Sequence, residues 1–251
     1  MAPGLFPQAH PCSLDFPPIP FRGDATGLDQ PSLPKRGKAG TRVLSGCAPE
    51  HESQGVCSAN AQLTRRDQAG EALQFVALWQ KRTGANPQGL YVDSKVVPSP
   101  ALSQLHQRGL WFGTIRRRGA AIRRRLSALP ASPWHQAVLD TPHRRHQRIR
   151  YLDETVALPG DKGSLRQLAV TGLGREHPPL CLSNNATASA RALIVRYAGR
   201  HRVEDGLGMS VHFFHVDCVA RAGRLNVDLD TTRTVLAHGC LALAGQATAR
   251  L

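Results

Sequence analysis

The chain alternates short apolar segments, typical of strands, with amphipathic segments whose apolar residues recur at helical spacing. Apolar, β-prone segments predict strands at 12–21, 41–46, 55–63, 88–97 and 110–118. Helical spacing predicts helices at 65–84, 99–109 and 119–129. Gly84 and Gly109 end the first two helices, as expected for the residue that follows a last helical turn.

The remainder divides into a β-rich segment and a helical C-terminal part. Strands are predicted at 134–140, 149–158, 165–173 and 178–184, and helices at 187–222 and 228–246. This order predicts an α/β protein with a mixed sheet flanked by helices. We expect a disordered N-terminus at 1–11, a main domain at 12–129 that is completed by helices at 184–251, and a β-rich insertion at 130–183 outside the main sheet.

The composition adds a strongly basic character. The 251 residues carry a formal net charge of +14, and 27 of the 32 basic residues are Arg. A charge of this size predicts a polyanionic partner, most often nucleic acid. Arg binds phosphate with a planar fork, although a codon bias toward Arg would give the same count.

The basic residues gather in the middle of the chain. Residues 91–158 hold 12 Lys and Arg against four Asp and Glu. The densest cluster has six arginines within ten positions: Arg116, Arg117, Arg118, Arg123, Arg124 and Arg125. Like charges this close repel one another without an anion nearby, so we expect contacts with DNA phosphates; a solvated helix and loop is the alternative. Trp134 follows this cluster and either packs in the core or stacks on a DNA base.

Cysteine spacing and hydropathy argue against a secreted or membrane-spanning protein. The six cysteines form no C-x-x-C pair, and no signal-like segment opens the chain. Free thiols in a reducing cytoplasm are therefore expected. No apolar run approaches the roughly 18 residues of a membrane helix. We expect a cytoplasmic protein that associates with the nucleoid when it is bound to DNA.

Two acidic residues stand inside otherwise apolar strand segments, Asp15 in CSLDFPPIPF and Asp93 in QGLYVDSKVV. A buried carboxylate costs several kcal/mol unless it is paired or bound to a cation. Each could instead lie in solvent at a strand end, but two such residues followed by a helical Glu204 favour a shared site. If the first and fourth strands are adjacent, Asp15 and Asp93 meet near one edge of the core, within reach of Glu204.

The predicted helix around residue 200 carries Tyr197, Arg200 and Glu204 at spacings of three and four. Because a helix turns once per 3.6 residues, these side chains share one face. A surface ion pair is one explanation. Three converging carboxylates in a basic protein suggest another, a site for Mg²⁺ or Mn²⁺, with two ions about 4 Å apart as in phosphoryl transfer.

The phrases SLDF, GLYVDSK, LHQRGLWFGTIRRR, RYAGRHRVED, HFFHVD and LNVDLD stand between about residue 12 and residue 246. They resemble the DDE transposases of bacterial insertion sequences, in the group with a β-rich insertion. The resemblance implies a ribonuclease-H-like fold whose first strand, fourth strand and late helix carry the catalytic acids. Carried over, these acids are Asp15, Asp93 and Glu204, which would also be the metal ligands.

The resemblance extends to DNA contacts. The family signature is Tyr, two residues, Arg, three residues, Glu, six residues, Lys, and its first three members match Tyr197, Arg200 and Glu204. This implies that Tyr197 and Arg200 contact phosphates at the transposon end. The Lys position is Val211, with His212 beside it as a weaker substitute. Because the family's longer N-terminal end-binding region is missing, the resemblance predicts a truncated or decayed copy.

The predicted function is a cut-and-paste transposase that cleaves double-stranded DNA at element ends and transfers the strands. The resemblance implies that it would use Mg²⁺ or Mn²⁺, with two ions in the family's manner, and would assemble as a homodimer on DNA. One alternative is a non-catalytic, DNA-binding remnant, favoured by the missing N-terminal region and opposed by the three acids. Another is a different metal-dependent nuclease of the same fold, opposed by the Tyr–Arg–Glu signature.

Overall fold

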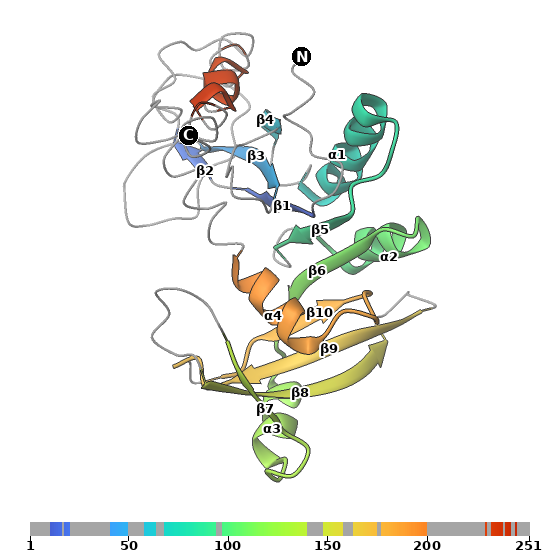
Figure 1. The fold of residues 1–251 in the computed structure, drawn as a ribbon, viewed down its shortest axis with the longest axis vertical. Coiled ribbons are helices and arrows are strands. Elements are labelled where there is room, and N and C mark those ends of the chain that lie inside the picture. Colours follow the sequence, from blue (N-terminus) through green and yellow to red (C-terminus); the bar gives the residue numbers. More distant parts are fainter. Residues whose placement is uncertain are drawn as a thin grey trace. The chain divides into compact units, whose positions relative to one another are not determined.

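The computed structural model describes nine segments and a few C-terminal residues. They are residues 11–16, 18–20, 41–49, 58–63, 68–93, 97–139, 148–157, 163–174, 177–199, 229, 232–237, 239–241 and 244. The chain forms two compact units, one of residues 1–88 with 200–251 and the other of residues 89–199. Figure 1 gives the elements of both. We refer to them as the first and second units.

The first unit contains an antiparallel sheet and one long helix. Its elements are β1 (Cys12–Asp15), β2 (Pro18–Pro20), β3 (Thr41–Pro49), β4 (Ser58–Leu63) and α1 (Gln68–Thr83). Strand β3 pairs with β1, β2 and β4, always antiparallel. The order of strands followed by a helix confirms the one predicted from the sequence. Residues 22–40, between the strands predicted at 12–21 and 41–46, lie outside the described residues.

Helix α1 packs through the apolar face that its spacing predicted. Phe75, Val76 and Trp79 are buried, and the rings of Phe75 and Trp79 lie 5.7 Å apart. Glu71, in the first turn, is also buried and accepts hydrogen bonds from Asn60 Nδ2 of β4 at 3.3 and 3.4 Å. These contacts hold the helix against the sheet of the first unit.

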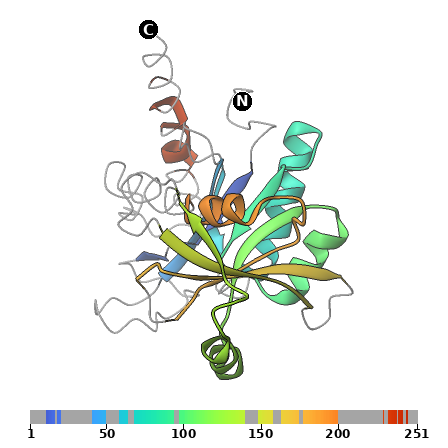
Figure 2. The same cartoon turned by 60° about the horizontal axis from the view of Figure 1, so that its bottom comes forward.

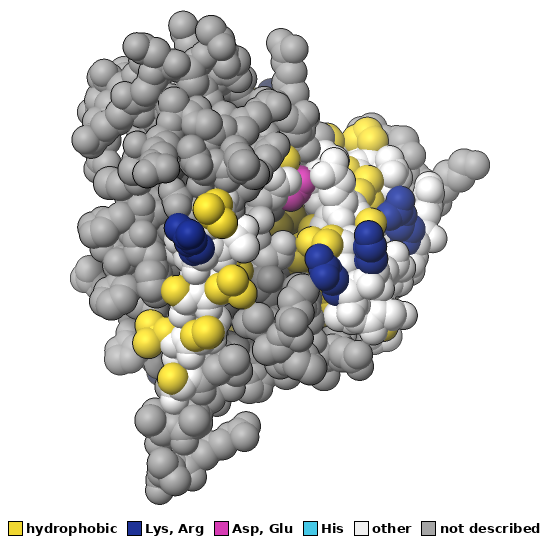
Figure 3. Space-filling model, turned by 90° about the horizontal axis from the view of Figure 1, so that it is seen from above, with side chains coloured by type: hydrophobic (Ala, Val, Ile, Leu, Met, Phe, Trp, Pro, Cys, Tyr) yellow, Lys and Arg dark blue, Asp and Glu magenta, His cyan; other side chains and the backbone are white. Residues whose placement is uncertain are grey.

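The described C-terminal residues are helical, within the segment 228–246 that was predicted as a helix. Three of its leucines are about half exposed: Leu229, Leu236 and Leu241. Hydrophobic side chains also stand at the surface on the face drawn in Figure 3, interspersed with Lys and Arg. None of the described helices is both long and apolar enough to cross a membrane.

The second unit is built on a six-stranded sheet with three helices. Its elements are β5 (Gly89–Val92), α2 (Ser99–Gln107), β6 (Trp111–Arg116), α3 (Ala120–Ala128), β7 (His135–Val138), β8 (Arg148–Ala157), β9 (Ser164–Thr171), β10 (Leu180–Ser183) and α4 (Ala190–Gly199). The strand order is β5-β6-β10-β9-β8-β7. Strands β5 and β6 are parallel, and every later pair is antiparallel. The sheet is therefore mixed, as the sequence predicted.

The β-rich segment joins this sheet directly. Strand β10 pairs antiparallel with β6, from Leu180 opposite Arg116 to Ser183 opposite Gly113. This differs from the expectation that residues 130–183 stand outside the main sheet. The physical reason is that β6 would otherwise present an open edge, and the segment supplies the strand that satisfies its backbone groups.

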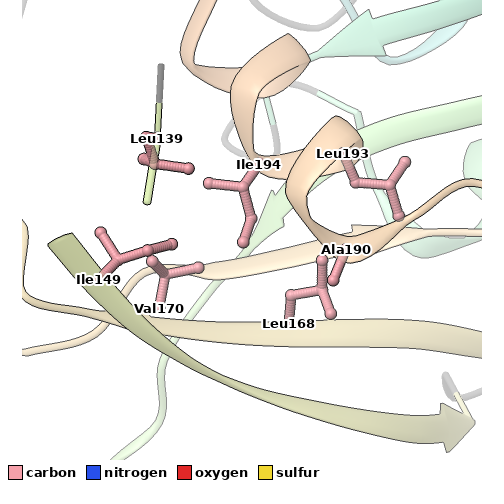
Figure 4. Packing of buried hydrophobic residues seen from close by; sticks show 7 residues of the cluster. All are labelled: Leu139, Ile149, Leu168, Val170, Ala190, Leu193 and Ile194. Atoms are coloured by element: carbon pink, nitrogen blue, oxygen red, sulfur yellow. The ribbon is translucent and has the colours of Figure 1, made fainter. Parts of the chain in front are cut away.

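The sheet of the second unit has two apolar faces with different helices on them. On one, which we name the α4 face, Leu168 and Val170 pack with Leu193 and Ile194 of α4 (Figure 4). On the other, the α3 face, Leu126 of α3 packs with a second cluster. That cluster contains Leu152, Ala169 and Leu180. Figures 1 and 2 show α3 and α4 on opposite sides of these strands.

The cysteine prediction is confirmed for the three cysteines whose side chains the structure describes. Cys12, Cys181 and Cys240 are free thiols. Burial raises the pKa of the Cys181 thiol to about 12, because the apolar surroundings disfavour the thiolate. Cys181 is therefore a packing residue rather than a nucleophile.

Candidate functional site

The two strand acids lie at strand ends, as their sequence context allowed. Asp15 is the last residue of β1, stands opposite Gly46 of β3 and is half-buried. Asp93 directly follows β5, whose four residues are all buried, and is also half-buried. Its carbonyl accepts a hydrogen bond from the N–H of Val97 at 3.1 Å, which turns the chain away from the strand. Asp15 belongs to the first unit and Asp93 to the second, so their convergence stays a prediction.

The signature tyrosine lies over the strand that ends at Asp93. Tyr197, in the last turn of α4, makes an edge contact with Tyr91 of β5, with ring centroids 6.5 Å apart. Tyr91 in turn contacts the Trp111 ring edge-on at 5.4 Å and is only 1% exposed. The contact between the two tyrosines therefore places the C-terminal turn of α4 on one face of β5.

Asp93 belongs on that same face. Side chains alternate along a strand, so residues two apart point to the same side, and Asp93 is two residues after Tyr91. The contact places Tyr197 on the α4 face, and strand alternation predicts that Asp93, directly after β5, points to the same face. Arg200 and Glu204 lie outside the described residues. If the helical repeat of α4 continues, Glu204 falls seven positions on, back on the face of Tyr197.

Two glycines make room for this aromatic contact. A Cβ on Gly113 would lie 2.4 Å from the Tyr91 ring, and one on Gly89 would lie 2.1 Å from the Trp111 ring. Gly89 stands opposite Trp111 and Tyr91 opposite Gly113 across the parallel pair, so each ring covers a glycine of the neighbouring strand. No role was predicted for these glycines from the sequence. The sequence feature that could have indicated them is a glycine two residues from an aromatic residue in each strand, in Gly89-Leu90-Tyr91 and in Trp111-Phe112-Gly113.

The start of α4 is anchored by a residue that the sequence analysis also missed. Arg166 of β9 donates from Nε to Asp153 Oδ1 at 2.9 Å and from Nη2 to Asp153 Oδ2 at 2.6 Å. It also donates from Nη1 to the carbonyl of Ala188, just before α4. Asp153 raises the pKa of the Arg166 guanidinium above its ordinary value, chiefly through these hydrogen bonds. The pair fixes the loop from which α4 carries Tyr197 over β5.

An asparagine side chain extends the pairing of β6 beyond the end of β10. Asn184 Oδ1 accepts the N–H of Phe112 at 2.7 Å, and its Nδ2 donates to the carbonyl of Leu110 at 2.8 Å. Ser183 Oγ donates to the Phe112 carbonyl at 2.5 Å. These bonds hold the chain between β10 and α4 in register with β6.

Hydrogen bonds tie Arg116, Arg118 and Arg125 of the arginine cluster to partners within the second unit. Arg125 of α3 donates to both oxygens of Glu154, at 2.5 and 2.7 Å. Gln167 links this pair to Arg116: it accepts from Arg116 Nη1 at 2.8 Å and donates to Glu154 at 3.1 Å. Arg118 donates to the carbonyl of His177 at 2.7 Å. These arginines hold α3 and the segment before β10 to the sheet, whatever else they bind.

The Arg125 pair also changes the acidity of its partner. Hydrogen bonding to Arg125 lowers the pKa of Glu154 below its ordinary value, and burial opposes part of that effect. The remaining members of the cluster, Arg117, Arg123 and Arg124, are exposed. Their contact with DNA stays a prediction.

Trp134 packs against the hydrophobic core, which is one of the two roles predicted for it. Its half-buried ring lies against the α3-face cluster of Leu126 and Leu152. It also lines a hollow of about 290 Å³ with Arg150 and Thr171. The packing explains the position of the ring, and stacking on a base stays a prediction.

The expected metal site cannot be assembled from the described residues alone. Among them, no three His, Cys, Asp or Glu side chains gather closely enough to hold a metal ion. Glu204, one of the three expected ligands, lies outside them, as does His212. Asp15 and Asp93 carry the carboxylate oxygens that Mg²⁺ prefers, so the donor chemistry of the two described ligands fits such an ion.

Comparison with known proteins identifies the fold. No protein-family model matches the chain, and no curated protein matches it in sequence. The fold, however, is similar to that of a solved structure, a piggyBac transposase in a synaptic complex with hairpin DNA. The TM-score is 0.57 and the sequence identity is 11%. The match covers 96% of this chain and 48% of the transposase, so the chain spans about half the length of that protein. The likeness confirms the predicted fold class, a ribonuclease-H-like mixed α/β sheet flanked by helices.

Proposed function

We propose that the protein is a DNA transposase of the DDE type, which cleaves DNA strands at the ends of an insertion sequence and joins them to target DNA. The observation that carries the proposal is the contact of Tyr197 with Tyr91, which brings the signature helix to the face of β5 where Asp93 lies. The similarity of this fold to that of a piggyBac transposase also supports the proposal. The proposed catalytic acids are Asp15, Asp93 and Glu204.

These three carboxylates are the proposed ligands of Mg²⁺ or Mn²⁺. When bound, two such ions stabilise the attacking and leaving oxygens of a phosphodiester. The protein's own part is to hold the carboxylates ionised at strand and helix positions that do not move during the reaction. Water first attacks the phosphodiester at the element end, and the freed 3′-hydroxyl then attacks the target strand.

Substrate binding is proposed to rest on the basic residues. Tyr197, Arg200 and His212 would contact phosphates beside the carboxylates, and the six clustered arginines would contact phosphates of double-stranded DNA elsewhere on the protein. The cluster comprises Arg116, Arg117, Arg118, Arg123, Arg124 and Arg125. A homodimer on DNA and a place in the bacterial cytoplasm, at the nucleoid, belong to the same proposal.

A nicking assay tests the proposal. The substrate is a supercoiled plasmid that carries the genomic DNA flanking the reading frame, with Mg²⁺ or EDTA. We expect Mg²⁺-dependent nicking that falls by at least about 100-fold in Asp93→Asn and in Glu204→Gln, because losing even a residue that only supports a metal ligand costs up to about 100-fold. Glu154→Gln removes the same charge from the α3 face and should retain nicking at pH 7.5.

Two results would count against the proposal. Nicking that survives both Asp93→Asn and Glu204→Gln would remove the acids from the reaction. Tight DNA binding without Mg²⁺-dependent nicking, by a protein whose circular dichroism is that of a folded chain, would favour the non-catalytic DNA-binding protein instead.

A further inference from the structure

The exposed arginines of the second unit are unevenly divided between the two faces of its sheet. Ile149 packs on the α4 face, so its neighbours Arg148 and Arg150 point to the α3 face. The hollow that Arg150 lines together with Leu126 of α3 confirms this direction. Arg123 and Arg124 are exposed on α3 itself. These four arginines form what we name the α3-face basic surface.

No described acid neutralises this surface. Helix α3 contains no acidic residue. Glu154 is the acidic residue among the described strand positions that point to the α3 face. Both of its carboxylate oxygens already accept hydrogen bonds from Arg125. Four exposed guanidinium groups on a face whose described strand acid is already paired favour a polyanionic partner.

The carboxylate of the proposed catalytic site is on the other side. Tyr197 and α4 cover the face of β5 on which Asp93 lies, and both views in Figures 1 and 2 place α3 across the sheet from α4. Duplex DNA is stiff: bending 20–30 base pairs by 40–90° already costs about 1–6 kcal/mol. One duplex that contacted both faces would therefore have to bend around the sheet, at a cost of this kind.

We propose that the α3-face basic surface binds a second DNA duplex, separate from the one at Asp93, through phosphate contacts of Arg123, Arg124, Arg148 and Arg150. The proposal rests on the proposed function only in that the first duplex occupies the site at Asp93. Phosphate contacts of this kind carry no sequence information and position a duplex by its backbone. Because cleavage and joining would both take place at the carboxylates, this surface would hold a duplex away from the reacting phosphates.

Native mass spectrometry counts both components of each particle at once. The full chain is mixed with an excess of a 16-base-pair duplex in EDTA, so that no cleavage takes place. The test variant is Arg123→Gln, Arg124→Gln and Arg150→Gln together. The control removes three exposed basic residues of the first unit, Lys81→Gln, Arg82→Gln and Arg233→Gln, and so has the same net charge.

We expect particles with two duplexes per chain for the wild type and the control, and with at most one for the test variant. A wild type that never exceeds one duplex per chain would overturn the proposal, as would a test variant that still takes two. A variant that binds none would make this surface the whole DNA site rather than a second one. A second position filled by a single-stranded 16-mer but not by the duplex would assign the surface to single strands.

The salt dependence of binding gives an independent measure. Each phosphate contact contributes about 0.9 to the slope of log K against log salt, so the test variant should lose about 2.7 and the control less than 1. An equal loss in both variants would mean that overall charge, and not this surface, binds DNA. The duplex count and the salt dependence are both measured without metal. A failure of the nicking assay therefore does not affect either result.

Discussion

Gly113 sets the position of the aromatic contact on which the proposed site depends. A Cβ at this position would meet the Tyr91 ring at 2.4 Å, and the next nearest atoms also belong to that ring. Tyr91 is 1% exposed, so its ring has little room to move away. Gly113→Ala therefore forces the ring from its place, and with it the contact between Tyr91 and Tyr197.

The cost follows from the two opposing effects of the added methyl group. Overpacking a buried site costs about 1–3 kcal/mol, and this close contact belongs in the upper part of that range. Replacing Gly by Ala also restricts the unfolded chain, which stabilises the folded state by about 0.4–1 kcal/mol. The net loss is about 1–2.5 kcal/mol, which lowers Tm by about 2–10 °C for a chain of this size.

A double-mutant cycle assigns this loss to the ring. Thermal unfolding is measured for the wild type, Gly113→Ala, Tyr91→Ala and the double variant. In the Tyr91→Ala background the clash is gone, so Gly113→Ala should be neutral or slightly stabilising, with a coupling of about 2 kcal/mol. Gly70→Ala is the matched control, because its Cβ would meet no atom closer than 3.9 Å in helix α1 and should stabilise the protein.

The reasoning is refuted if Gly113→Ala leaves Tm unchanged, or if it destabilises the Tyr91→Ala background as much as the wild type. In the second case the cost would come from the backbone of β6 rather than from the Tyr91 ring.

Two further predictions concern titrating groups. Because Arg125 lowers the pKa of Glu154, its stabilising contribution is present above the ordinary pKa of 4.5 and is lost as the pH falls through the lower folded value. Urea unfolding should therefore find Glu154→Gln about 1 kcal/mol less stable than the wild type at pH 7, with the difference vanishing in acid; a constant difference would contradict the pairing. With its pKa raised to about 12, Cys181 should resist iodoacetamide at pH 8 in the folded protein while the exposed Cys240 reacts, as peptide mapping would detect. Equal labelling of both would show that Cys181 is accessible.

Local patterns were sufficient to predict most elements of the fold. The apolar spacing of α1 and the glycines that follow α1 and α2 are local signals, and Gly84 and Gly109 indeed have positive φ of 75° and 70°. The strand predicted at 88–97 is shorter, because the chain turns at Asp93 and the N–H of Val97 bonds back to its carbonyl. A continuous apolar run could not reveal that turn.

The contacts that position the site depend on register, which the sequence does not display. Arg166 and Asp153 are 13 residues apart and meet because β8 and β9 pair in one particular alignment. Arg125 and Glu154 are 29 apart and meet because α3 packs on β8. The arginine run therefore looked uniform in the sequence, although some of its members hold the fold together and others face solvent.

The acids themselves could be chosen from the sequence, because an Asp in an apolar strand is costly without a partner. Whether the three carboxylates converge could not be predicted from the sequence, because convergence depends on how three separate segments pack together. The contact of Tyr197 with Tyr91 supports the choice of Asp93, and Asp15 and Glu204 remain predictions.

The most direct test of the account is to locate the metal ion among these acids by iron-mediated cleavage. Fe²⁺ replaces Mg²⁺, ascorbate and peroxide are added, and the polypeptide is cut close to the bound ion, with the cuts mapped by mass spectrometry. The account predicts cuts near Asp15, Asp93 and Glu204 in the same folded protein, all suppressed by excess Mg²⁺ and lost in Asp93→Asn. Cuts at one of these positions alone, or cuts that persist in Asp93→Asn, would contradict it.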